Sequence, residues 1–297
     1  MIEVEQEEAV AYAAPATVED ALALLGSDDR AKLVAGGQSL FVFMRQGLLA
    51  PSLMIGLRGV AELHQFDLTE DGGASIGAMV TQHALACSTL LERRFPALAE
   101  AAAAVASPLI RRQGTIGGNL CHADPTGDPP AALIALGAEI EIASSVGRRR
   151  VPVEAFFVDY METTLAEGEL LVRIHLPEPA RESGSAYIKH RVRGIDTALV
   201  GAAAAITLSA DGDRIEDARI GLVGAATTPL RAVAAESLLI GTELTSDALA
   251  LAAAAAAGEC EPLGDTEGSE QYRREMVAVF VRRAAERAIG RARRTLA

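Results

Sequence analysis

Two glycine-rich segments contain the residues of this chain that are best suited to bind a ligand. Segment 35–40 reads Ala-Gly-Gly-Gln-Ser-Leu and follows an apolar run, and segment 115–120 reads Thr-Ile-Gly-Gly-Asn-Leu. Consecutive glycines lack Cβ atoms and can adopt positive φ, so several backbone N–H groups can point into one concavity and bind anionic oxygens. Side-chain donors at the rims of the two segments are Gln38, Ser39, Thr115 and Asn119. The pair of segments predicts a phosphate site, although one segment alone would favour an ordinary tight turn.

The common nucleotide-binding fingerprints are missing from the sequence. It contains no G-x-x-x-x-G-K-[ST] and no G-x-G-x-x-G between a strand and a helix. A nucleotide bound by this chain must therefore be held by a different scaffold.

Cysteine and histidine spacing argues against a metal centre on this chain. Cys87, Cys121 and Cys260 lie far apart with no C-x-x-C pair, which excludes a disulfide framework and a zinc or iron–sulfur site. His122 and Asp124 are close in sequence, but two ligands without further Cys or His nearby make a weak site. We therefore predict no metal here and a hydrogen-bonding role in the loop for both residues.

Composition and charge narrow the class of protein. Hydrophobic residues make up 50% of the 297 residues and charged residues 23%, which is enough apolar surface for a globular core. The 40 acidic residues outnumber the 27 basic ones, for a net charge of −13, and aromatic residues are only 4%. This balance opposes binding of a polyanion and offers few rings for stacking bases, so nucleic acid is not an expected partner.

The apolar runs are too short to span a bilayer. The longest, at 198–208 and 249–257, are alanine-rich and well below the roughly 20 residues that a membrane helix needs. The first residues are acidic, the opposite of a signal-peptide n-region; they include Glu3, Glu5, Glu7 and Glu8. We expect a cytoplasmic protein with no integral membrane segment.

Local patterns predict an α+β protein in which runs of strands are followed by runs of helices. Thr17 is an expected N-cap, segment 40–49 is expected to be a short helix or a second strand, and 107–128 is expected to be a long loop that ends at an N-cap, Asp128. Predicted strands are 32–35, 53–55, 74–78, 139–143, 149–153, 170–176, 185–190, 197–208 and 215–223. Predicted helices are 18–25, 82–87, 97–105, 128–136, 230–238, 246–257 and 271–294. The final helices are expected to cover one face of an antiparallel sheet.

The order of these motifs resembles the flavoprotein (medium) subunit of the molybdenum hydroxylases, the family that includes aerobic carbon monoxide dehydrogenase and xanthine dehydrogenase. The resemblance spans nearly the whole chain. Its residues are those of 12–25, 35–40, 115–125, Asp128, 156–177 and 187–189, together with Asp196.

The resemblance implies a bound FAD. It implies a two-lobed FAD-binding domain of the vanillyl-alcohol oxidase (PCMH) type at 1–177, with lobes at about 1–57 and 58–177, followed by a C-terminal domain at 178–297 with an antiparallel sheet and helices. The residues it implies for FAD binding are Leu33, Val34, Ala35, Gly36, Gly37, Gln38, Ser39, Leu40, Thr115, Ile116, Gly117, Gly118, Asn119, Asp124, Asp128, Leu171 and Lys189. Segment 33–40 is expected to wrap the pyrophosphate and 115–119 to close it from the other lobe.

Three of these residues also have simpler interpretations. Asp128 precedes Pro129 and fits a helix N-cap, and Leu171 lies in an apolar strand where core packing is usual. Lys189 fits a solvated strand edge, although a cation near the flavin would stabilise its anionic reduced form.

The implied activity is electron transfer within an oxidoreductase complex. Substrate is oxidised at a molybdopterin centre in a large subunit, electrons pass through [2Fe–2S] clusters in a small subunit, and the FAD of this chain passes them to an external acceptor. A dimer of heterotrimers is implied, with no catalytic acid, base or nucleophile on this chain.

Two other functions stay open at this point. A stand-alone FAD oxidase or dehydrogenase would need an acid or base near the flavin, for which the candidates are His122, Asp124 and Tyr187. A non-enzymatic binding module would use the glycine segments only as turns.

The chain carries arginines on both sides of Val192 and in a cluster near its C-terminus. Relatives often carry an arginine three residues after the lysine, where this chain has Val192 between Arg191 and Arg193, so the electron-acceptor side stays open. A basic cluster near the C-terminus is expected to form a solvated helix face, with an acidic patch on a sister subunit as the second interpretation. Its members are Arg282, Arg283, Arg287, Arg291, Arg293 and Arg294.

Overall fold

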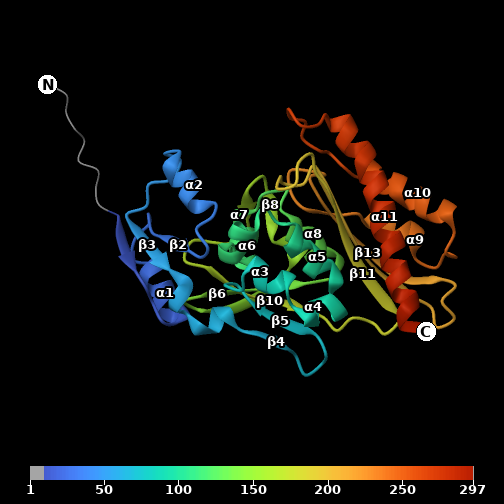
Figure 1. Ribbon diagram of the computed structural model, residues 1–297. Coiled ribbons are helices and arrows are strands. Elements are labelled where there is room, and N and C mark those ends of the chain that lie inside the picture. The colour runs from blue at the N-terminus through green and yellow to red at the C-terminus, as the bar shows by residue number, and fades with distance from the viewer. Residues whose placement is uncertain (1–9, 297) are drawn as a thin grey trace.

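The structure is a computed structural model that describes residues 10–296, so the acidic segment with Glu3, Glu5, Glu7 and Glu8 lies outside the described residues. The N-terminal lobe is a small parallel sheet in the order β1-β3-β2 with two helices (Figure 1). Its elements are β1 (Ala11–Ala13), α1 (Val18–Leu25), β2 (Lys32–Val34), α2 (Leu40–Arg45) and β3 (Leu53–Gly56). The Thr17 hydroxyl accepts a hydrogen bond from the Asp20 N–H at 3.0 Å, which confirms the predicted N-cap.

The second lobe is a five-stranded antiparallel sheet in the order β4-β5-β10-β6-β7, with a group of helices. Its strands are β4 (Phe66–Leu68), β5 (Ala74–Gly77), β6 (Glu139–Ser144), β7 (Gly147–Pro152) and β10 (Leu170–Leu176). Its α-helices are α3 (Gln82–Ala86), α4 (Thr89–Arg94), α5 (Pro96–Ala104), α6 (Pro108–Gln113), α7 (Ile116–His122) and α8 (Asp128–Ala135). Short elements are the 3₁₀ turns Leu57–Gly59, Ala61–His64 and Val153–Ala155, and the pair β8 (Phe157–Asp159) and β9 (Glu162–Thr163).

The expected long loop at 107–128 is wrong, because two helices occupy most of it. Ser107 and Thr115 act as N-caps: their hydroxyls accept from the Ile110 N–H at 3.4 Å and from the Gly118 N–H at 3.1 Å. Each cap satisfies an otherwise unpaired N–H in a first turn, and this local interaction outweighs the poor helix propensity of the glycines.

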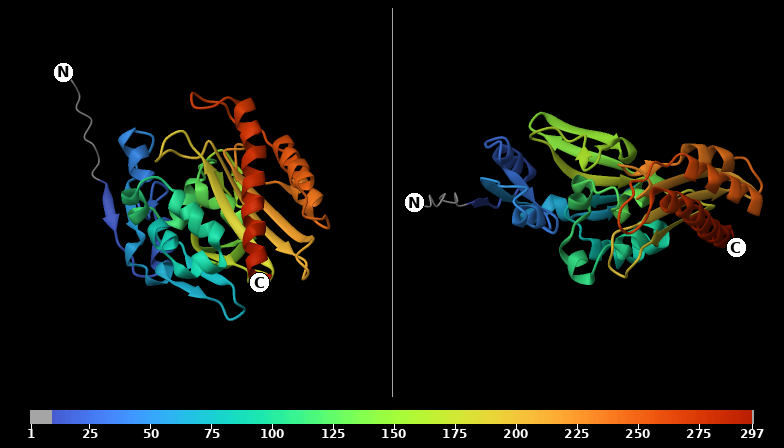
Figure 2. Two further views of the ribbon diagram at one scale, coloured as in Figure 1. Left: turned by 45° about the vertical axis from the view of Figure 1, so that its right-hand side comes forward. Right: turned by 90° about the horizontal axis from the view of Figure 1, so that it is seen from above.

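The C-terminal part is an antiparallel sheet in the order β11-β12-β13-β14, followed by three helices. The elements are β11 (Ser183–His190), β12 (Val200–Leu208), β13 (Ile215–Val223), β14 (Leu230–Arg231), α9 (Val233–Leu239), α10 (Ser246–Gly258) and α11 (Glu270–Leu296). Figure 2 shows these helices at the end of the molecule opposite the N-terminal lobe.

This sheet is buried on both faces, whereas the sequence predicted helices over one. Helix α11 packs on β11 and β12, and helices α5 and α8 of the second lobe pack on the other side (Figure 1). Alternate residues of β12 serve the two cores: Ala202 and Ala204 face the C-terminal helices, and Ala203 faces the second lobe. Gly221 is needed for this packing, because a Cβ there would lie 2.1 Å from the Ala131 carbonyl oxygen of α8.

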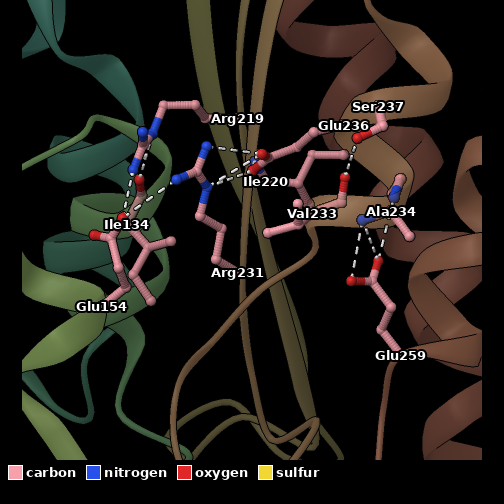
Figure 3. Close-up of polar contacts among 11 residues, drawn as sticks. Ile134, Glu154, Arg219, Ile220, Arg231, Val233, Ala234, Glu236, Ser237 and Glu259 are labelled. Carbon is pink, nitrogen blue, oxygen red and sulfur yellow. Dashed lines mark hydrogen bonds and ion pairs between the residues drawn. The ribbon is translucent and has the colours of Figure 1, made fainter.

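An ionic network also joins the second lobe to the C-terminal sheet (Figure 3). Glu154 pairs with Arg219 of β13 at 3.0 Å and with Arg231 of β14 at 3.4 Å. Arg231 also pairs at 2.9 Å with Glu236 of α9, whose carboxylate accepts from the Ile220 N–H. Glu154 of the second lobe is thus linked through two arginines to Glu236 of α9.

The basic cluster of α11 only partly matches the predicted solvated face. Arg291 pairs with Glu100 of α5 at 2.6 Å and donates to the Ser185 carbonyl, and Arg287 approaches Glu100 at 3.4 Å. Arg293 and Arg294 are exposed, as predicted. The partner of the inner arginines is an acidic residue of the same chain.

We predict that Glu236→Ala lowers the free energy of unfolding by about 3 kcal/mol, because it breaks an ion pair whose carboxylate is buried and leaves the Ile220 N–H unpaired. Urea denaturation measures the change. Glu286→Ala is the matched control, since Glu286 pairs with Arg282 on the exposed face of α11 and its loss should cost no more than about 0.5 kcal/mol. Equal losses in the two variants would contradict the assignment of Glu236 to the buried part of the network.

Candidate functional site

One cavity of about 930 Å³ brings together both glycine-rich segments. Its wall is contributed by the N-terminal lobe, the second lobe and the end of strand β11. Of the residues predicted to bind the cofactor, all but two line this cavity. The two exceptions are Val34, the last residue of β2, and Ile116, which is fully buried in the core at the start of α7.

The first glycine-rich segment contacts Gln113, which lies just before the second segment. The Gln38 side chain donates to the Gln113 side-chain oxygen at 3.0 Å and to the Gly36 carbonyl at 3.0 Å. A Cβ on Gly36 would lie 2.1 Å from the carbonyl oxygen of Gln113, so only glycine allows the two backbones to lie this close.

Positive φ occurs in the first segment but not in the second. Gly37 has φ +70°, and a Cβ there would also lie 2.4 Å from the Phe41 ring. Gly117 and Gly118 lie in the first turn of α7, and neither has positive φ. The interpretation of both segments as loops with left-handed glycines is therefore wrong for the second, where the Thr115 cap imposes helical geometry.

The second segment needs glycine for packing. A Cβ on Gly117 would lie 2.6 Å from the Cβ of Ala78, and one on Gly118 would lie 2.9 Å from Thr115 Oγ1. Asn119 and Gln82 each have a buried side-chain oxygen without a hydrogen-bond partner, and both residues line the cavity. Unpaired buried oxygens beside a cavity are typical of a site that takes a polar ligand. Gln82 was not predicted, because a single glutamine at a helix start gives no signal in the sequence.

Asp128 and Lys189 form a buried ion pair on the cavity wall. Lys189 Nζ lies 2.8 Å from Asp128 Oδ2, and the side chains are 4% and 5% exposed. Lys189 also donates to the Ala104 carbonyl at 3.1 Å, and the Tyr187 hydroxyl donates to Asp128 Oδ1 at 2.5 Å. The interpretation of Lys189 as a solvated edge residue is therefore wrong.

The Asp128 side chain does not cap its helix. Helix α8 begins at Asp128 itself, Gly127 occupies the N-cap position, and no side-chain capping bond is present. Burial raises the pKa of Asp128, and Lys189 and Tyr187 oppose this shift. The pKa of Tyr187 is raised well above its usual value, chiefly by burial and then by the Asp128 charge, so its hydroxyl stays protonated and donates.

His122 and Asp124 have local structural roles. Asp124 Oδ1 accepts from the Thr126 N–H at 2.8 Å and from the Thr126 hydroxyl at 2.7 Å, which shapes the turn before α8. His122 packs on the Phe43 ring with centroids 5.4 Å apart, and burial lowers its pKa. Within residues 10–296, no group of three His, Cys, Asp or Glu residues is placed to hold a metal ion.

Cys121 and Leu171 also line the cavity. Cys121 is an exposed free cysteine on the cavity wall. Leu171 lines the cavity from the start of β10 while being 2% exposed, which agrees with both its predicted binding role and its core role.

Known proteins match this chain along nearly its whole length. Residues 6–179 match the family model described as "FAD binding domain in molybdopterin dehydrogenase", and residues 185–288 match "CO dehydrogenase flavoprotein C-terminal domain". The fold and the site thus define a flavoprotein of the molybdopterin dehydrogenases.

The chain belongs to the family of FAD-binding medium subunits of the molybdenum hydroxylases, as the sequence motifs predicted. It is 39% identical over 286 residues to the carbon monoxide dehydrogenase medium chain of Afipia carboxidovorans, covering 95% of this chain and 97% of that protein. It is 37% identical over 289 residues to the 6-hydroxypseudooxynicotine dehydrogenase complex subunit alpha of Paenarthrobacter nicotinovorans, covering 96% of each. The structure of carbon monoxide dehydrogenase from Hydrogenophaga pseudoflava superposes with a TM-score of 0.91 and 38% identity, covering 95% of this chain and 98% of that chain.

The family confirms an oxidoreductase, with FAD as its cofactor. The cavity fits this cofactor, because glycine backbone lies at its wall and because it offers the Lys189 ammonium and polar side chains, including the unpaired oxygens of Gln82 and Asn119. No helix in the described part of the chain has both the length and the apolar character needed to cross a membrane.

We predict that Gly37→Val or Gly118→Val lowers FAD affinity at least tenfold. A β-branched side chain at Gly37 is strained by its φ and meets Phe41, and one at Gly118 displaces the Thr115 cap. Flavin content per chain after gel filtration, followed by titration with FAD, measures the loss.

Gly47→Val is the control for backbone strain. Gly47 has φ +71° with nothing within 4 Å of an added Cβ, so it carries the same strain without blocking any neighbour. Full flavin content in the Gly37 or Gly118 variant would show that the segment concerned does not bind the cofactor.

Proposed function

We propose that this chain is the electron-transferring FAD subunit of a heteromeric molybdenum hydroxylase. It takes electrons from the [2Fe–2S] clusters of a small partner subunit and passes them to an external acceptor. The observation that carries this proposal is that both glycine-rich segments, 35–40 and 115–120, open onto a single cavity.

The residues of the chain bind and orient the cofactor. We propose that segment 33–40 and segment 115–119 hold the diphosphate. The first segment uses the backbone N–H groups around Gly37 and the second uses the Asn119 side chain, because the N–H groups of 116–119 are already bonded within the protein. Leu171, Asp124, Asp128 and Lys189 complete the wall. Bound FAD supplies the redox chemistry, and the protein supplies position and electrostatics.

The state of the titratable groups disfavours a stand-alone oxidase. Such an enzyme needs a free acid or base facing a substrate at the flavin. Asp124 is bound to the Thr126 hydroxyl and N–H, His122 is packed on Phe43, and the Tyr187 hydroxyl donates to Asp128. Asp124 and Tyr187 are thus already hydrogen-bonded to protein groups, which favours a role in electron transfer.

The names of relatives support the proposed assembly. One is a medium chain and another is a subunit of a dehydrogenase complex. We propose a large molybdopterin subunit and a small [2Fe–2S] subunit as partners, arranged as a dimer of heterotrimers in the cytoplasm. We also propose a domain boundary near Pro177, between an FAD-binding domain at 1–177 and a C-terminal domain at 178–297.

Purification of the chain from its native host tests the assembly. We expect two partner polypeptides by mass spectrometry, with molybdenum and iron in the complex by metal analysis. Under anaerobic conditions, an organic substrate of the complex should bleach the flavin of the assembled complex and leave that of the isolated chain oxidised. Reduction of the isolated chain by such a substrate would favour the stand-alone enzyme instead.

A further inference from the structure

We propose that Tyr187 is a positioning residue for the cofactor: through Asp128 it holds the Lys189 ammonium with one N–H group directed to the cavity. This inference rests on the proposed function, because it assigns that N–H group to bound FAD. Neither the family models nor the relatives assign a role to Tyr187.

The hydrogen bonds of Lys189 leave one of its donors without a protein acceptor. A lysine ammonium has three N–H donors. One donates to Asp128 Oδ2 and one to the Ala104 carbonyl, and the described residues provide no acceptor for the third. Since Lys189 lines the cavity and its side chain is only 4% exposed, the remaining donor is directed toward whatever fills the cavity. A buried, unpaired charged donor is costly, so a ligand acceptor there is strongly favoured.

Tyr187 binds the second carboxylate oxygen of Asp128 and does not line the cavity. Its hydroxyl donates to Asp128 Oδ1, so each carboxylate oxygen has its own donor and Oδ1 does not compete for Lys189. Tyr187 is not part of the cavity wall, although it is almost completely buried. It therefore acts on the cofactor only through Asp128 and Lys189.

The C-terminal sheet is built to hold this side chain. Tyr187 and Lys189 are two residues apart on β11 and so point to the same face, toward the second lobe. On the neighbouring strand, a Cβ at Gly201 would lie 2.3 Å from the Tyr187 hydroxyl oxygen, so glycine is required there. The Tyr187 N–H donates to Glu100, which is paired with Arg291 of α11. The last helix of the chain thus anchors the tyrosine that orders the cavity wall.

Charge explains why this arrangement matters for electron transfer. The reduced flavin in its anionic form carries more negative charge than the oxidised form, so an ammonium N–H directed to it favours the reduced form, although Asp128 balances the charge of Lys189. Without the Tyr187 hydroxyl, Asp128 Oδ1 is left unpaired in a buried site and recruits the free N–H of Lys189. That N–H then turns away from the cavity, and binding of reduced FAD weakens selectively.

The full chain, freed of flavin, provides the test. It is titrated with oxidised FAD and, under argon, with dithionite-reduced FAD. We expect Tyr187→Phe to change the affinity for oxidised FAD less than threefold and to weaken that for reduced FAD about tenfold. The quantity compared between variants is the ratio of the affinity for reduced FAD to the affinity for oxidised FAD. For a two-electron couple, a tenfold fall in this ratio lowers the midpoint potential of the bound flavin by about 30 mV. Tyr272→Phe is the matched control, since it removes a hydroxyl that bonds His190 on the same strand, away from Asp128, and should leave the ratio unchanged.

A double-mutant cycle separates positioning from a merely structural effect. Lys189→Met should lower the same ratio further, and Tyr187→Phe/Lys189→Met should be no worse than Lys189→Met alone, because the tyrosine acts only through the lysine. A ratio in Tyr187→Phe that equals or exceeds the wild-type value overturns the proposal, as does an additive loss in the double variant. Failure of the wild-type chain to bind either form of FAD would instead refute the proposed function.

Discussion

The cavity of this protein depends on one close approach between two backbones. Gly36 lies against the carbonyl of Gln113, at a distance that leaves no room for a Cβ, and the side chains of Gln38 and Gln113 bridge the same contact. This contact joins the N-terminal lobe to the second lobe. Because both glycine-rich segments adjoin it, residues of 35–40 and of 115–119 line the same cavity.

The second constraint is that the two faces of the C-terminal sheet pack in two different hydrophobic cores. Small residues on β12 and a glycine on β13 allow helices to pack tightly against both faces. Consequently β11 is part of the C-terminal domain by connectivity and part of the cofactor cavity by position. Lys189 reaches the cavity only because the face of β11 that carries it is turned toward α8 and its first residue, Asp128.

Charged residues at the junction of the domains are arranged in separate groups that share no residue. One contains Glu154, Arg219, Arg231 and Glu236 and lies between the second lobe and α9. Another joins Glu100 to Arg291, and a third is the buried pair at the cavity. Partly exposed pairs contribute little each, whereas a buried charge that loses its partner is costly, so the pairs of Glu236 and of Asp128 are the ones whose loss should destabilise the protein most.

Much of the fold could be predicted from the sequence because its signals are local. The strands β10 and β13 and the helix α1 begin and end where the apolar patterns and caps placed them, since hydrophobic periodicity and capping act over a few residues. The two glycine-rich segments were likewise identifiable from residue type alone. Their conformations were not, because the sequence does not show that Thr115 caps a helix through its glycines while Gly37 adopts positive φ.

Tertiary structure alone decided which residues meet. The partners Asp128 and Lys189 are 61 positions apart, and Tyr187 and Asp128 are 59 apart, so no periodicity relates them. Whether Asp128 caps its helix or accepts from a lysine, and whether that lysine is solvated or buried, depends on how α8 packs against β11. Local patterns determine elements because they reflect interactions between neighbours in the chain, whereas the electrostatics of the cavity arise from the packing of distant segments.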